Sequence, residues 1–227
     1  LRRGFRQENL FIAGFHFINK TISYYSESSV NEIRKKLGLG LNNELYIFFD
    51  PNVVYRGYIS QQEQVAVLIT LLELAKRYPE IALIIKPHPA EKNKILESIV
   101  LNFELSNVKL IPSTDLPYDS LYASDLIISK YSTLLFQAMF MGLPGLSVIL
   151  DNEKNFMIYE NAVDYFFSLD SLREFIIKLI KDQDLRHKWK KDINERQQQY
   201  LVSQGLSAKL FYGSSIAKGL KSLVVEL

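Results

Sequence analysis

The stretch KPHP, at positions 86–89, places two side chains that can bind anions between prolines at the end of an apolar run. Lys86 and His88 each precede a proline, which favours an extended backbone at both positions. We expect Pro89 in the first turn of a following helix, where free backbone amides attract anions. Lys86 and His88 are therefore candidate phosphate-binding residues. A His88 that only caps this helix, or bonds a neighbouring loop, fits the same sequence.

A second group of polar side chains lies in SKYST, at positions 129–133. The hydroxyls of Ser132 and Thr133 can cap a helix that begins there, or bind a phosphate together with its first amides. With Ser129 they are more hydroxyls than one cap requires. Gln137 is polar among apolar neighbours one turn later, and helical side chains lean toward the start of their helix. It can contact a sugar hydroxyl of a nucleotide, or it can be a surface residue of that helix.

A third junction, IPSTDLPYDS, lies at positions 111–120, where a nucleotide base could stack on Pro112 or Tyr118. Patterns of other chemistries are absent: there is no glycine-rich phosphate loop, no paired-histidine metal helix and no nucleophile elbow. The three histidines are far apart in the sequence, so we expect no metal site. No residue pattern identifies a catalytic group.

These junctions are expected to lie between the strands and helices of an α/β protein. Short apolar runs alternate with segments of helical period, which is typical of βαβ units with a parallel sheet and helices on both faces. Strands are predicted at 9–18, 44–51, 81–87, 107–112, 125–129, 145–150 and, at one edge, 165–169. Helices are predicted at 30–37, 60–79, 90–103, 115–124, 131–142, 171–181, 184–199 and 207–223. We therefore expect a Rossmann-like, doubly wound sheet whose ligand binds at the carboxyl ends of its strands.

Composition excludes several classes of protein. The 227 residues carry a formal net charge of +2, too small an excess for a protein that binds nucleic acid through electrostatics. There is no cysteine, which excludes disulfides and permits a cytoplasmic location. No apolar run reaches membrane-spanning length. Glu8 and His16 interrupt the apolar start, so we do not expect a signal peptide.

Three segments in order carry a resemblance to a known family: KPHP, then SDLIISKYSTLLFQAMFMGLPGLSV, then a C-terminal helix that begins with QGLSAKL. The chain resembles the C-terminal, donor-nucleotide-binding half of two-Rossmann (GT-B) glycosyltransferases that build bacterial surface polysaccharides such as capsule and teichoic acid. Related groups are the CDP-glycerol glycerophosphotransferases, the polysialyltransferase and Kdo-transferase types, and the UDP-sugar 2-epimerases.

The resemblance implies roles for particular residues. The histidine of the family's HP motif falls on His88, at the donor phosphates, and the small-hydroxyl element falls on Ser132 and Thr133. The acidic residue that often binds the nucleotide ribose falls on Gln137, where the amide offers an uncharged and therefore weaker hydrogen bond. A second frequent acidic residue falls on Gln204.

The resemblance also implies an organisation and partners. Residues 1–40 would be a hinge strand and first helix, 41–205 the nucleotide-binding domain, and 206–227 a helix that packs back toward an N-terminal domain. That domain would hold the acceptor and the catalytic base. The chain begins with Leu, so we expect such a domain to precede it and the chain alone to be inactive. The donor would be UDP-, CDP- or CMP-linked, no cofactor would be needed, and the acceptor would be a polysaccharide or lipid-linked chain.

Two other functions fit the same residues. A UDP-sugar 2-epimerase shares the expected fold, and a non-catalytic domain that binds nucleotide sugars would explain amides at Gln137 and Gln204. We expect a cytoplasmic protein and leave open a peripheral association with the inner membrane face.

Overall fold

The computed structural model describes residues 30–150, apart from positions 53, 55, 56, 58, 92, 93 and 131, and residues 158–204. The chain divides into two units. Ser28–Tyr200 form one unit, and the two ends of the chain form the other, of which only 201–204 are described. The predicted strand 9–18 and the predicted helix 207–223 lie outside the described residues. The division predicted at positions 40 and 205 stays a prediction.

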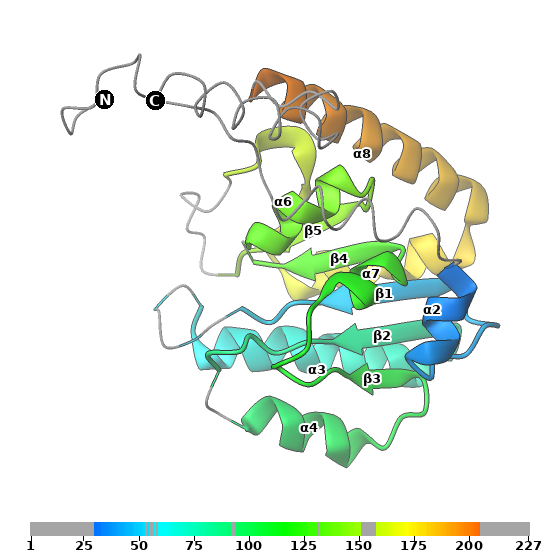
Figure 1. Cartoon of the computed structure of the whole chain (residues 1–227), viewed down its shortest axis with the longest axis vertical. Coiled ribbons are helices and arrows are strands. Elements are labelled where there is room, and N and C mark those ends of the chain that lie inside the picture. Colours follow the sequence, from blue (N-terminus) through cyan, green and yellow to red (C-terminus); the bar gives the residue numbers. More distant parts are fainter. Residues whose placement is uncertain are drawn as a thin grey trace, which may run out of the picture. The chain divides into compact units, whose positions relative to one another are not determined.

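Six parallel strands form one sheet in the order β3-β2-β1-β4-β5-β6 (Figure 1). The strands are β1 Leu45–Phe49, β2 Ile81–Ile85, β3 Val108–Leu110, β4 Leu126–Ser129, β5 Gly145–Val148 and β6 Asp164–Phe166. The chain runs outward from β1 to β3 and then returns to place β4 on the other side of β1. The point where the order reverses, between β1 and β4, is where doubly wound sheets bind their ligands. The prediction of a doubly wound α/β sheet is confirmed, with β6 at the edge.

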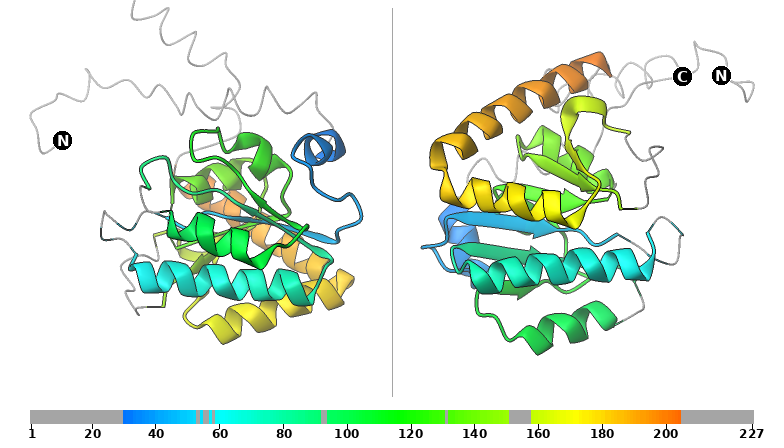
Figure 2. Two further views of the ribbon diagram at one scale, coloured as in Figure 1. Left: turned by 90° about the horizontal axis from the view of Figure 1, so that it is seen from below. Right: turned by 180° about the vertical axis from the view of Figure 1, so that it is seen from behind.

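The central strands are mostly apolar because helices cover both of their faces, with Ser129 in β4 and Ser147 in β5 as buried polar exceptions. Every residue of β1, β2, β4 and β5 is buried. Seen from behind, α3 (Gln61–Arg77) and α7 (Leu169–Lys181) lie side by side on one face (Figure 2). The short α5 (Tyr118–Tyr122) and α6 (Thr133–Phe140) lie on the opposite face (Figure 1).

Three further helices complete the unit. α4 (Ile95–Phe103) contacts α3, and α2 (Val30–Lys36) contacts α5. α8 (Gln183–Ser203) follows α7, and its Trp189 donates a hydrogen bond of 2.6 Å to the carboxylate of Asp164 in β6. Glu160–Ala162 form a short 3-10 helix before β6. None of the helices among the described residues is long and apolar enough to cross a bilayer.

The helix predicted at 90–103 begins later than expected. α4 starts at Ile95, with no side chain capping it at Lys94. The residues after KPHP instead form a turn, in which the Glu91 N–H donates to the carbonyl of His88 (2.9 Å). Pro89 is therefore not in the first turn of a helix, and the prediction of a helix N-terminus beside His88 is wrong. α6 is also shorter than predicted, because Gly142 with φ +64° ends it in the left-handed region.

Candidate functional site

The polar residues that follow β1, β2 and β4 meet at the carboxyl edge of the sheet. The predicted residues Lys86 and His88 lie after β2, and Ser129, Ser132 and Thr133 lie at and after β4. β1 lies between those two strands and pairs with both, so its own end, Asp50-Pro51-Asn52, lies at the reversal of strand order.

His88 has one ring nitrogen engaged and the other available. Its Nδ1 accepts a hydrogen bond from the Ala90 N–H at 3.0 Å. In the neutral ring an accepting Nδ1 carries no proton, so Nε2 carries it and is a donor. No described residue is bonded to Nε2. His88 therefore stabilises its own turn, without capping a helix, and its Nε2–H can still donate to a ligand.

Lys86 is turned into the protein. Its side chain is 5% exposed, and Nζ donates to the carbonyl of Ser113, after β3, at 3.1 Å. Burial lowers the pKa of Lys86, and the carboxylates of Asp50 and Asp115 partly oppose that shift. The ammonium thus links the ends of β2 and β3 and holds the loop that carries Pro112 and Tyr118.

Ser132 is the N-cap of α6. Its hydroxyl accepts the Leu134 N–H at 3.1 Å and is also hydrogen-bonded to the carboxyl of Asp50. Thr133, at the first helical position, is exposed. The Leu135 N–H donates to the Ser132 carbonyl at 3.1 Å, so the Thr133 N–H and hydroxyl are the groups at the start of α6 best placed to meet an anion.

Asp50 connects the two predicted junctions. It is 4% exposed, and burial raises its pKa against the opposing effect of hydrogen bonds from Ser132, the Asn52 N–H and Ser129 and of the nearby His88. The Ser129 hydroxyl lies 3.2 Å from Asp50 Oδ2 and 3.0 Å from Asn52 Oδ1. Asp50 therefore lies at the reversal point, within reach of both the His88 turn and the cap of α6.

Asn52 adopts a conformation that few residues accept. Its φ is +59°, in the left-handed region where asparagine is enriched. Its side-chain oxygen accepts the N–H of Lys130 at 2.9 Å, and its carbonyl accepts Gln64 Nε2 at 3.1 Å. Strained backbone held by several contacts is typical of functional sites.

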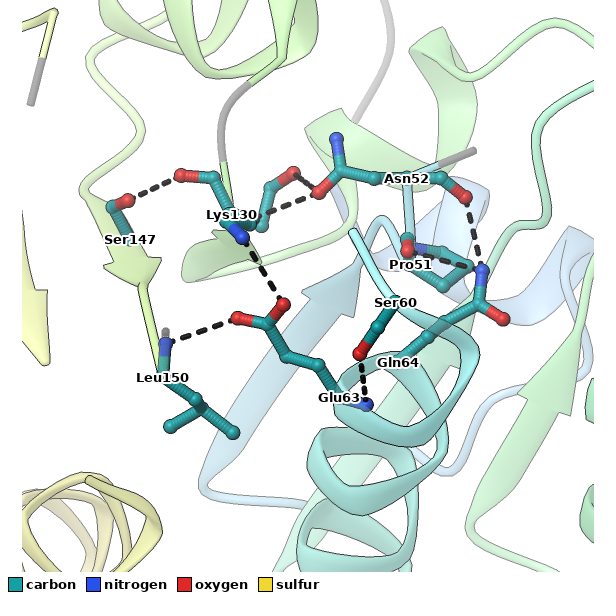
Figure 3. A network of polar contacts seen from close by, with 9 residues as sticks. Pro51, Asn52, Ser60, Glu63, Gln64, Lys130, Ser147 and Leu150 are labelled. Carbon is teal, nitrogen blue, oxygen red and sulfur yellow. Dashed lines mark hydrogen bonds and ion pairs between the residues drawn. The ribbon is translucent and has the colours of Figure 1, made fainter. Parts of the chain in front are cut away.

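A buried ion pair lies beneath these residues (Figure 3). Lys130 Nζ is 3.0 Å from Glu63 Oε2, and the two side chains are 1% and 6% exposed. The other carboxylate oxygen of Glu63 accepts the Leu150 N–H at 3.0 Å. Glu63 lies in the first turn of α3, whose N-cap Ser60 accepts the Glu63 N–H at 3.0 Å. Ser147 of β5 donates its hydroxyl proton to the carbonyl of Lys130.

The predicted nucleoside residues lie at the margins of this site. Pro112 is exposed and Tyr118 is half-buried at the start of α5. Gln137 lies in α6, and its Oε1 is buried with no hydrogen-bond partner among the described residues. Gln204 is exposed, one residue beyond α8. Among the described residues, no group of three histidine, aspartate or glutamate side chains could hold a metal ion.

Sequence reasoning missed Asp50, Asn52, Glu63 and Lys130. Asp50 and Lys130 follow an apolar strand directly, as Lys86 does, and Asn52 lies two residues after Asp50, so the same rule could have found this group. Glu63 is an acidic residue in the first turn of a helix. That pattern alone indicates only a favourable interaction with the helix dipole.

The order of the strands defines a doubly wound, Rossmann-like α/β domain, and the polar carboxyl edge at its reversal point is a candidate ligand site. Residues 3–170 match the family described as CDP-Glycerol:Poly(glycerophosphate) glycerophosphotransferase. The chain belongs to this family, which confirms the resemblance to transferases of surface-polymer synthesis. No curated protein matches the sequence.

Solved structures are similar in fold. A variant of the wall teichoic acid polymerase TagF soaked with CDPG aligns at a TM-score of 0.63 and 15% identity, over 97% of this chain and 52% of TagF. UDP-GlcNAc 2-epimerase from Neisseria meningitidis, bound to UDP-GlcNAc, aligns at 0.57 and 14% identity, over 91% of this chain and 51% of its own. The C-terminal domain of the glycosyl transferase group 1 family protein LpcC from Francisella tularensis aligns at 0.55 and 13% identity, over 82% of this chain and 97% of its own. This chain thus spans about half of the first two proteins and nearly all of the isolated C-terminal domain.

Proposed function

We propose that this chain is the donor-binding half of a transferase that uses a nucleotide-activated donor in the synthesis of a cell-surface polymer. The observation that carries the proposal is the meeting of the His88 turn and the N-terminus of α6 around Asp50, at the reversal of strand order. The oxygens of a diphosphate there would accept hydrogen bonds from the Nε2–H of His88 on one side and from the Thr133 N–H and hydroxyl, at the positive end of the α6 dipole, on the other.

The family match supports CDP-glycerol as the donor ahead of UDP- or CMP-linked donors. The nucleoside would extend toward Pro112 and Tyr118, while Gln137 Oε1, which has no partner among the described residues, would accept a ribose hydroxyl. Through its bond to the Ser113 carbonyl, Lys86 would hold the loop that carries Pro112 and Tyr118, and its buried ammonium would add positive charge near the site. The donor is a substrate, and we propose no other cofactor.

The reaction would be the displacement of CMP from phosphorus. An acceptor hydroxyl forms a bond to the phosphorus of the glycerophosphate group, and the bond from that phosphorus to the oxygen of CMP breaks. Negative charge then develops on the departing CMP phosphate, where the His88 N–H and the amides of α6 would stabilise it. A base must take the proton of the acceptor hydroxyl, and no described residue is assigned that role.

We further propose that an N-terminal domain supplies the acceptor site and that base, since this chain spans about half of the similar full-length structures. The acceptor would be a polysaccharide or lipid-linked chain, reached from the cytoplasmic side of the membrane. Positioning of donor against acceptor can contribute about 7–11 kcal/mol, so the chain by itself should transfer nothing.

Titration of the chain with CDP, UDP and CMP, followed by amide NMR, tests the proposal. We expect the amide signals of residues 88–91 and 132–135 to shift with CDP first. Shifts confined to other parts of the sheet, or none at millimolar nucleotide, would overturn it. A preference for UDP over CDP would favour the epimerase alternative, and binding without activity in a chain completed by its N-terminal domain would favour the non-catalytic one.

A further inference from the structure

The ion pair of Glu63 and Lys130 lies at the proposed donor site without belonging to its surface. Together with Ser147 and Leu150 it joins three elements: the start of α3, the residue after β4, and the end of β5 (Figure 3). We name these four residues the clamp. Because the charged side chains are 1% and 6% exposed, neither can contact a ligand in the crevice directly.

An ion pair buried this deeply is a poor source of stability. Removing two charges from water is costly, and neutral side chains of similar volume often give equal or greater stability. The geometry instead suggests a positional role. Lys130 is two residues from the N-cap Ser132. Its N–H donates to Asn52, its ammonium donates to Glu63, and its carbonyl accepts the hydroxyl proton of Ser147.

We propose that Glu63 and Lys130 are positioning residues for the donor, an inference that rests on the proposed function. The clamp holds the backbone between β4 and α6 in place, so that the N-terminus of α6, with the Thr133 N–H and hydroxyl, faces the anion that His88 meets from β2. Loss of the pair should therefore weaken nucleotide binding through geometry, although neither side chain touches the nucleotide.

The test is the double variant Glu63→Gln, Lys130→Met in the 227-residue chain. It keeps the net charge and closely matches both side-chain shapes, and it leaves an amide oxygen for the Leu150 N–H. A matched control, Asp170→Asn with Arg173→Met, makes the same change in charge at the surface, where Arg173 pairs with Asp170 at 2.7 Å and with Glu73 at 3.6 Å. CDP affinity is measured by calorimetry well below the melting temperature, at low and high salt, beside thermal melts.

We expect the double variant to melt within a few degrees of the wild type and to bind CDP about tenfold more weakly or worse, since small misplacements carry large penalties. The ratio of the two affinities should be the same at high salt, because a geometric defect is not screened as a charge effect is. The amides of Leu134 and Leu150 should shift in its spectrum, and the control should match the wild type throughout.

Equal CDP affinity in the wild type and a folded double variant would overturn the inference and leave the proposed function standing. A wild type that melts cooperatively and binds no nucleotide would overturn both. If the double variant does not fold, Glu63→Gln alone decides. The glutamine side chain keeps one acceptor oxygen for two donors, Lys130 Nζ and the Leu150 N–H, so this variant should bind CDP more weakly than the wild type. Unchanged CDP affinity in the folded variant would refute the inference.

Discussion

The role of His88 can be tested by substitution because its two ring nitrogens would make different hydrogen bonds, one within the protein and one to the ligand. Nδ1 accepts the Ala90 N–H at 3.0 Å, which contributes to stability, and Nε2–H is the proposed donor to phosphate. Asparagine can place an oxygen near the position of Nδ1, since its side chain bonds the backbone two residues on in the same way. Glutamine can place an amide N–H near the position of Nε2. The two substitutions therefore separate the structural task from binding.

The expected magnitudes follow from these two bonds. The turn bond is neutral, so losing it should cost about 0.5–1.5 kcal/mol, or about 1–6 °C in melting temperature for a unit of this size. A hydrogen bond to a charged phosphate contributes about 1.5–3 kcal/mol, which corresponds to about 10- to 150-fold in affinity. His88→Asn should therefore keep its melting temperature and lose CDP affinity, whereas His88→Gln should lose stability and keep part of its affinity. His88→Ala should lose both.

Thermal melts and CDP titration of the three variants give the result. The reasoning fails if His88→Asn and His88→Ala bind CDP as tightly as the wild type, because His88 would then serve only its turn. It also fails if His88→Gln melts like the wild type, because the bond to Ala90 would then contribute nothing.

Three further outcomes are expected. Gly145→Ala should lower stability by about 1–3 kcal/mol in a denaturant titration, because its Cβ would lie 2.9 Å from Val163 Cγ1 and 3.0 Å from Leu135 Cδ2; wild-type stability would contradict this. Burial raises the pKa of Asp50, so the folded protein binds that proton more tightly than the unfolded chain, and this contribution to stability is lost as the pH rises through the folded-state pKa. Asp50→Asn should therefore gain stability relative to the wild type between acidic and neutral pH, and parallel pH profiles would refute that sign. With labelled CDP-glycerol and a polymer acceptor, the chain alone should give no product, and turnover would show that it holds a complete active site.

The order of the elements could be predicted from the sequence, and so could the candidate site at the strand ends, because both follow from local patterns; the site stays a prediction. Apolar strands alternate with helical periods, and ligands meet such sheets at strand ends. The sequence could not supply the partners of Lys86 or Lys130, because their hydrogen bonds cross between strands whose neighbours are set by the order of the whole sheet. The start of α4 was misplaced for a local reason: the His88 ring accepts the Ala90 N–H and stabilises a turn instead of a first helical turn.

The clamp has a consequence for how the protein folds. Glu63 is 67 positions from Lys130 and 87 positions from Leu150, so its two bonds close very long loops. Such contacts form late, because the entropy of loop closure has to be offset by other native contacts first. A growing polypeptide whose synthesis has not passed β5 would contain Glu63 and Lys130 but would lack Leu150, so the clamp would be incomplete. Nucleotide should accordingly stabilise only the fully folded unit, and the rise in melting temperature with CDP would report global folding.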